Sequence, residues 1–281
     1  MVETILYPEP PAVGPLLARA LVSRRGRMLT PDSLPERTVR IPRQRTSVPR
    51  LAAYARVCSL PLTDTLPPTW LHVLAFPLHT AILAAPDFPV PPAGLVHVRN
   101  QMTSHRLAMV GDDLDLQATT GLVLPHAKGV AFEIIAEARV DGELVWTGVS
   151  TYLARGAATG PGEQRPVSAW PSPAQHWHLP ADLGRRYAAV AGDMNPIHLS
   201  VATARLFGYR RPIAHGMWTH ARALAALGHR PERYTVAVDF HRPILLPARV
   251  GFSVRGTEFA VIAPGSGKQL ISGKLDSLPP G

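Results

Sequence analysis

The sequence predicts an α+β fold of two similar domains, each an antiparallel β-sheet wrapped around a central α-helix. The first observation behind this prediction is that helix-like sequence is followed by several strand-like runs twice along the 281 residues. The second is a faint internal repeat, in which Tyr54 aligns with Tyr187 and Val57 with Val190. A chain of this length is comfortable for two domains of ordinary size. The 46% hydrophobic and 17% charged residues indicate a globular protein.

Strand-like runs follow the helical sequence in each half. In the first half Asp141 and Gly142 form a turn signal that suits a hairpin between two of these runs. The predicted strands are 95–102, 104–109, 113–120, 129–140 and 143–153 in the first half, and 235–241, 249–258 and 268–275 in the second.

The domain organisation follows from these runs and from the loop-forming sequence between them. Residues 154–173 are rich in Gly, Pro and Ser, which is typical of a linker. We therefore expect an N-terminal extension over residues 1–48, with a short helix around 15–22, a first domain over 49–153 and a second over 174–281.

The densest set of reactive side chains lies between two predicted helices of the second half. A helix over 183–191 ends at Gly192, because a glycine can adopt the left-handed cap without cost. Pro196 cannot continue a helix, so Asp193 to Ile197 should form an ordered turn. Ser200 can then cap the next helix. Asp193 and His198 therefore share one connection, from which both can reach a single cleft.

A purely structural role is the alternative for this turn. Asp193 and Asn195 can simply hydrogen-bond the backbone, and His198 can be a buried interface histidine. The surrounding sequence favours a functional role, because Y-A-x-x-x-G-D-x-N-P-I-H is followed by G-Y-R-x-P-I-A-H-G-M and then by V-D-F-H-R-P-I-L-L-P. These elements, in this order, resemble the MaoC-like dehydratases and hydratases, which have the hot dog fold and include the (R)-specific enoyl-CoA hydratases.

The resemblance implies a double hot dog fold and a set of catalytic roles. Asp193 and His198 would activate water and exchange the proton, and Asn195 would orient them. The backbone N–H of Gly216, at the start of a helix from Met217 to Leu227, would hold the thioester oxygen. His215 would shape this turn or support the pair, and the sequence leaves these two roles open. Substrate-binding candidates are Tyr187, Arg210, Arg211 and Met217.

The resemblance also implies that the first domain is a degenerate copy. Our alignment sets Leu60 against Asp193 and Thr65 against His198, and it places Phe76 opposite His215. The copy has thus lost the ionisable groups of the motif. Its apolar residues would line a tunnel for an acyl chain, although core packing explains most of them equally well.

Composition limits the partners and the compartment. The net charge of +9 favours anionic partners in general, and nucleic acid is the weaker choice because no nucleic-acid-binding motif accompanies the charge. The resemblance implies acyl-CoA or an acyl carrier protein as the partner. His176 and His178 lack further ligands at zinc spacing, so we expect no metal, and the resemblance implies no cofactor. Cys58 is the single cysteine, so no disulfide can form within the chain. We see neither a signal peptide nor a membrane span and therefore expect a cytoplasmic protein. A homodimer is a further expectation.

The function expected from this resemblance is reversible hydration of trans-2-enoyl thioesters to (3R)-3-hydroxyacyl thioesters in fatty-acid or related acyl metabolism. Two alternatives remain. One is a hot dog acyl-thioester hydrolase, which the complete N-P-I-H element disfavours. The other is a non-catalytic acyl-thioester-binding subunit of a heteromeric dehydratase, which the presence of both Asp193 and His198 disfavours. The sequence leaves open the chain length, the carrier and the physiological direction.

Overall fold

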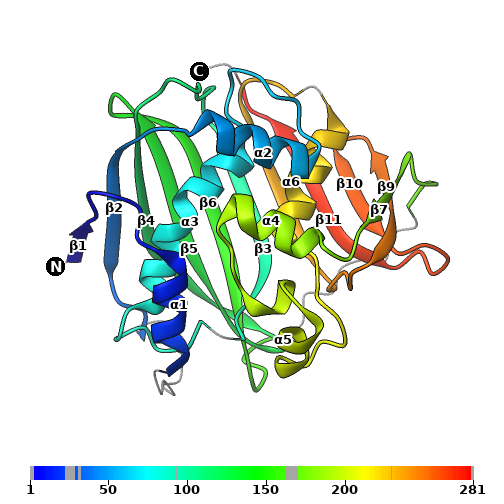
Figure 1. The fold of residues 1–281 in the computed structure, drawn as a ribbon, viewed down its shortest axis with the longest axis horizontal. Coiled ribbons are helices and arrows are strands. Elements are labelled where there is room, and N and C mark those ends of the chain that lie inside the picture. The colour runs from blue at the N-terminus through cyan, green and yellow to red at the C-terminus, as the bar shows by residue number, and fades with distance from the viewer. Residues whose placement is uncertain are drawn as a thin grey trace.

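The dominant feature of the fold is one large, mostly antiparallel sheet with the helices packed against it (Figure 1). The computed structural model describes residues 3–22, 29–30, 33–92, 94–161, 170–228 and 230–279. The strands of the sheet are β1 (Glu3–Leu6), β2 (Arg37–Gln44), β3 (Val96–Ser104), β4 (Leu114–His126), β5 (Gly129–Val140), β6 (Glu143–Arg155), β7 (Gln175–Leu179), β8 (Tyr234–Phe240), β9 (Ala248–Arg255), β10 (Glu258–Ile262) and β11 (Gln269–Ser277).

The order of the strands shows two halves arranged back to back. The sheet runs β1-β2-β4-β5-β6-β3-β8-β11-β10-β9-β7, so β2-β4-β5-β6-β3 in the first half mirrors β7-β9-β10-β11-β8 in the second. The halves join where β3 and β8 pair antiparallel, from Arg99 opposite Asp239 to Ser104 opposite Tyr234. An ion pair of 3.1 Å between Arg99 Nη1 and Asp239 Oδ1 lies on this seam. The α+β double hot dog fold predicted from the sequence is confirmed.

The helices lie on one side of the sheet, facing the viewer in Figure 1, and they also occur in matching pairs. Their bounds are α1 (Val13–Val22), α2 (Val48–Cys58), α3 (Pro68–Ala84), α4 (Leu183–Ala191), the 3-10 helix η2 (Pro196–His198), α5 (Val201–Leu206) and α6 (Gly216–Leu227). Helix α2 of the first half packs on α4 of the second, and the rings of Tyr54 and Tyr187 lie 6.0 Å apart. The repeat that aligned these two tyrosines therefore corresponds to a pair of helices in contact.

The second part of the repeat has a different register from the one that we predicted. Helix α3 begins at Pro68 and α6 begins at Gly216, so Pro67, not Phe76, occupies the N-cap position that His215 has in α6. The correct register places a tryptophan third and a histidine fifth in each helix: Trp70 and His72 in α3, Trp218 and His220 in α6. Our alignment set Pro77 against Gly216, the first residue of α6, whereas Pro77 lies inside α3.

Several predicted strands differ from the observed ones. The run 104–109 is a connection rather than a strand, in which His105 and Arg106 both donate backbone N–H groups to Val145 O. The single predicted strand over 249–258 is two strands, β9 and β10, because Gly256 turns the chain with φ of 60°. Strand β7 was missed. The hairpin at Asp141 and Gly142 is confirmed, with positive φ at both residues.

The segment that we treated as an N-terminal extension contributes to the sheet. Strand β2 pairs antiparallel with β4, and β1 pairs parallel with β2. The alternation of Val39 and Ile41, both buried, explains why this part of residues 1–48 forms a strand of the first half. In the linker prediction, residues 162–169 lie outside the described residues. Within the described part of the chain, no helix has the length and apolar content required to cross a bilayer.

Candidate active site

The turn after α4 positions Asp193 as the sequence predicted. Gly192 ends the helix in the left-handed region with φ of 82°. The carboxylate of Asp193 then accepts a hydrogen bond from the backbone N–H of Asn195, with Oδ1 at 3.1 Å. The side chain of Asn195 in turn caps η2, because its Oδ1 accepts from the N–H of Ile197 at 3.3 Å. Asn195 therefore fixes the short helix that carries His198.

The imidazole of His198 is held in one orientation by the backbone. Its Nδ1 lies 2.8 Å from the carbonyl oxygen of Ile213. A carbonyl oxygen only accepts, so Nδ1 carries the proton, and in the neutral ring the lone pair is on Nε2. His198 is buried and lines the pocket described below. It can thus serve as a base through Nε2.

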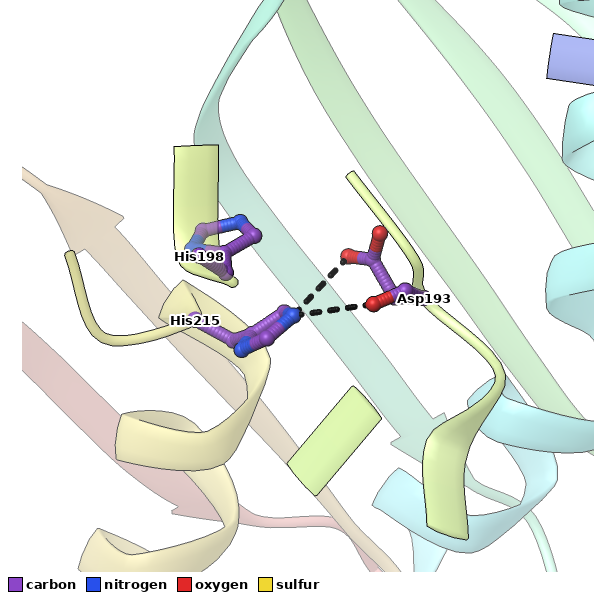
Figure 2. Close-up of side chains that lie close together, drawn as sticks. All are labelled: Asp193, His198 and His215. Carbon is purple, nitrogen blue, oxygen red and sulfur yellow. Dashed lines mark hydrogen bonds and ion pairs between the residues drawn. The ribbon is translucent and has the colours of Figure 1, made fainter. Parts of the chain in front are cut away.

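His215 connects the two catalytic candidates, as Figure 2 shows. Its ring stacks on that of His198 at a centroid distance of 3.6 Å, and its Nε2 lies 3.1 Å from the backbone oxygen of Asp193 and 3.8 Å from Asp193 Oδ2. Since the backbone oxygen is an acceptor, Nε2 of His215 is the donor. The ring of Tyr187 lies 4.8 Å from His215 on another side. His215 therefore packs between the groups and ties the Asp193 turn to the start of α6.

Burial sets the charges of this group. It raises the pKa of Asp193 above its ordinary value of 3.8, against the opposing effects of His198 and the Asn195 N–H. It lowers the pKa of His198 below 6.5, an effect that the Asp193 carboxylate and the Ile213 carbonyl oppose. The pKa of His215 is lowered by burial and by His198. The site therefore favours neutral imidazoles beside a carboxylate that takes up a proton more readily than an exposed one.

The N-terminus of α6 supplies backbone donors next to this group. The first N–H groups of a helix have no acceptor within the helix, and the helix dipole favours negative charge there. Gly216 is the first residue of α6 and lines the pocket. A Cβ atom at this position would lie 3.0 Å from Cε1 of Phe240. Glycine therefore lets the ring of Phe240 pack closely against this end of the helix.

All these residues border a pocket of about 930 Å³ that both halves of the chain line. Tyr187 and Met217, two of the predicted substrate-binding residues, contribute to it. Arg210 and Arg211 are exposed and are not among the lining residues, so their role in meeting the carrier of the substrate stays a prediction for the surface outside the pocket. They come from the exposed loop after α5, which turns its arginines to solvent. The exposed cations that do line the pocket are Lys128, Arg155 and Arg242.

Sequence reasoning missed these cations because two of them belong to the first half. Lys128 lies in the turn between β4 and β5, and Arg155 ends β6. His72, His97 and Tyr152 of the first half also line the pocket. Their distance from the motif along the chain hid them, and no local pattern marks them.

The same cluster provides possible metal ligands. In the part of the chain that the structure describes, Asp193, His198 and His215 each offer one ligand atom, and these atoms lie within 4.8 Å of one another. However, His198 Nδ1 and His215 Nε2 already donate to backbone carbonyls. His198 Nε2 and the Asp193 carboxylate remain for chemistry. This arrangement suits proton transfer to and from a water molecule.

Comparisons with known proteins agree with this geometry. The MaoC like domain family matches residues 163–264. The 3-hydroxyacyl-thioester dehydratase X of Mycobacterium tuberculosis is 33% identical over 228 residues, which cover 79% of this chain and 81% of the relative. The crystal structure of HtdX of Mycobacterium tuberculosis superposes with a TM-score of 0.78 at 29% identity, covering 86% of this chain and 100% of that one.

A more distant structure shares the fold. It is a MaoC-like dehydratase from Phytophthora capsici, with a TM-score of 0.71 and 19% identity, covering 89% of this chain and 98% of that one. Together with the similarity to the mycobacterial dehydratase, the matched domain identifies the group of enzymes to which the sequence is related. The chain belongs to the MaoC-like dehydratase family.

Proposed function

We propose that this chain catalyses the reversible addition of water to trans-2-enoyl thioesters, giving (3R)-3-hydroxyacyl thioesters in fatty-acid or related acyl metabolism. The observation that carries the proposal is that the Asp193 carboxylate and the His198 imidazole lie close together (Figure 2). Both residues line the pocket with Gly216, the first residue of α6. The mycobacterial relative is named as a 3-hydroxyacyl-thioester dehydratase, which supports the same chemistry here.

The catalytic roles follow from the atoms available. A water molecule held between His198 Nε2 and the Asp193 carboxylate adds to the β-carbon of the enoyl thioester, and one water proton passes to this pair. The pair returns a proton to the α-carbon. Negative charge develops on the thioester oxygen, and the N–H of Gly216 at the start of α6 stabilises it. Dehydration is the reverse sequence.

His215 and Asn195 act as positioning residues in this scheme. Asn195 caps η2 and so aims His198, and His215 stacks on His198 while it bonds the backbone of Asp193. Both therefore hold the distance between acid and base rather than exchange the proton themselves. No metal or cofactor takes part in the proposed reaction.

The division of labour between the halves belongs to the same proposal. We assign catalysis to residues 174–281 and treat 49–153, together with strand β2, as the degenerate domain that supplies the acyl tunnel. Helix α3 begins with Pro67 and Pro68 where α6 has His215 and Gly216, so its N-terminus lacks both the histidine and the first N–H donor.

The carrier of the acyl group is CoA or an acyl carrier protein. Lys128, Arg155 and Arg242 are exposed at the pocket, where they can meet the phosphate groups that either carrier bears. They join Arg210 and Arg211 as our candidates for carrier recognition. A cytoplasmic location and a homodimer remain part of the proposal.

Hydration of crotonyl-CoA and of a longer enoyl-CoA tests the reaction. Loss of the conjugated thioester absorbance without release of free thiol is the expected result. The His198→Ala variant should lose on the order of 10²–10⁴-fold in rate. The matched control is His176→Ala, which changes an exposed histidine of β7 and should keep the wild-type rate. Release of free CoA thiol would instead indicate a hydrolase, and no reaction of either kind would contradict the proposal for the isolated chain.

A further inference from the structure

The wall of the pocket that the first half contributes is partly polar. Helix α3 lines the pocket with His72, Val73, Phe76, Thr80 and Leu83. All of these except Val73 follow one another at spacings of four, four and three residues. These spacings place the four side chains on one helical face. A tunnel for a plain hydrocarbon chain needs only apolar side chains there. The histidine at the start of this face therefore requires an explanation.

The polar side chains of this wall form a connected cluster. The ring of His72 stacks on that of His97 at 6.1 Å, and His97 stacks on Tyr152 at 4.8 Å. The hydroxyl of Tyr152 lies 3.2 Å from Nδ1 of His79. The Asp193 carboxylate contributes to the raised pKa of Tyr152, after the larger effect of burial. Tyr152 and Asp193 both line the pocket, so the cluster and the catalytic carboxylate border the same cavity.

Part of the hydrogen-bonding capacity of this cluster is not used within the described residues. His72 is only 3% exposed and its Nδ1 has no hydrogen-bond partner, and the same holds for Nε2 of His97. A buried polar atom without a partner is costly, so native proteins usually satisfy it. Both residues line the pocket. These two nitrogens have almost no accessible surface, so a small turn of each ring toward the pocket is needed before a ligand can supply the missing partner.

The charge state of His72 favours an uncharged partner. Burial lowers the pKa of His72 to about 4, so its imidazole is neutral near pH 7. A neutral imidazole and a phenol can each donate to a hydroxyl or carbonyl oxygen, and each can accept from a hydroxyl group. They do not neutralise a carboxylate.

The chain contains an internal comparison for His72. His220 occupies the same fifth position of α6, is fully buried, and has no hydrogen-bond partner at either nitrogen. It is not among the residues that line the pocket. The two histidines are therefore matched in helix position and burial and differ in access to the pocket.

We propose that His72, His97 and Tyr152 form a binding site for an oxygen function, a hydroxyl or a carbonyl, on the acyl chain beyond the reacting carbons. The substrate class is then an oxygenated enoyl or 3-hydroxyacyl thioester rather than a plain fatty acyl thioester. This inference rests on the proposed hydratase function and refines its substrate. Phe76 and Leu83, further along the same face of α3, contact the apolar remainder of the chain.

The test compares enoyl-CoA substrates of equal length, one plain and a set with a single keto or hydroxyl group at successive carbons beyond the fourth. The ratio of kcat/KM for the oxygenated substrate to that for the plain one is measured in wild type, His72→Leu, His72→Gln and His220→Leu. At the preferred oxygen position the wild-type ratio should exceed one. It should fall about 10-fold or more in His72→Leu, as expected when a buried hydrogen bond to substrate is lost.

The control variants separate this inference from the proposed function and from simple misfolding. His220→Leu should keep the wild-type ratio, and His72→Gln, which retains a polar group, should keep part of the preference. The inference would be overturned if the ratio were the same in wild type, His72→Leu and His220→Leu. It would also be overturned if the wild-type ratio were below one at every position of the oxygen group. Hydration of the plain substrate by all four proteins would leave the proposed function intact in that case.

Discussion

The buried histidines predict a marked loss of stability in mild acid, and His220 allows the effect to be measured for one residue. Burial lowers the pKa of His220 from 6.5 to about 3. Between these values the unfolded chain binds a proton at this residue and the folded chain does not. The free energy of unfolding must therefore fall as the pH decreases below 6.5. The stabilising condition is neutral pH, at which both states carry a neutral ring.

The magnitude follows from the shift. From pH 7 to pH 5, His220 becomes almost fully protonated in the unfolded state and stays neutral in the folded state. At 1.36 kcal/mol per pH unit, this difference lowers the free energy of unfolding by about 2 kcal/mol. The variant His220→Leu removes this proton uptake and keeps a buried side chain of similar size. Urea unfolding at pH 7 and at pH 5 should show that wild type loses ~2 kcal/mol more than the variant between the two conditions. Equal losses in the two proteins would refute the reasoning.

Two further predictions concern the rate. Hydration should require neutral His198 and ionised Asp193, so the rate should be constant near neutral pH and fall in acid. Because burial lowers the pKa of His198 below 6.5, half-maximal kcat/KM should occur below pH 6.5, and a midpoint at or above that pH would contradict the assigned environment. Gly216→Ala should reduce kcat/KM by about 10-fold, because the new Cβ presses on the Phe240 ring, whereas Gly111→Ala, in open space, should have no effect.

The sequence was sufficient to predict the local structure of the site. Gly192, Pro196 and Ser200 are strong signals for a helix end, a turn and a helix start, and the structure has all three where expected. This local geometry brings Asp193 and His198 to one pocket. It also places Gly216 at the start of α6. The antiparallel strands were predictable wherever apolar residues alternate.

The remaining features depend on contacts that no local pattern reveals. The register of α3 was wrong because Pro77 lies inside a helix that tertiary packing stabilises. Arg210 and Arg211 are near the motif in sequence but point to solvent. Lys128 and His72 line the pocket although they lie more than fifty residues from the motif. Pairing of β3 with β8 brings these distant segments together.

The most direct test of the central claim is the rate of enoyl-CoA hydration by Asp193→Asn beside Asp182→Asn. Asp182 is the residue before α4 and its side chain makes no capping hydrogen bond, so it controls for the loss of one negative charge. Our account predicts that Asp193→Asn loses on the order of 10²–10⁴-fold in kcat. Asp182→Asn should retain wild-type activity, and the wild-type protein should form the 3R product. Near-normal hydration by Asp193→Asn would contradict the assignment of this carboxylate to the acid–base pair.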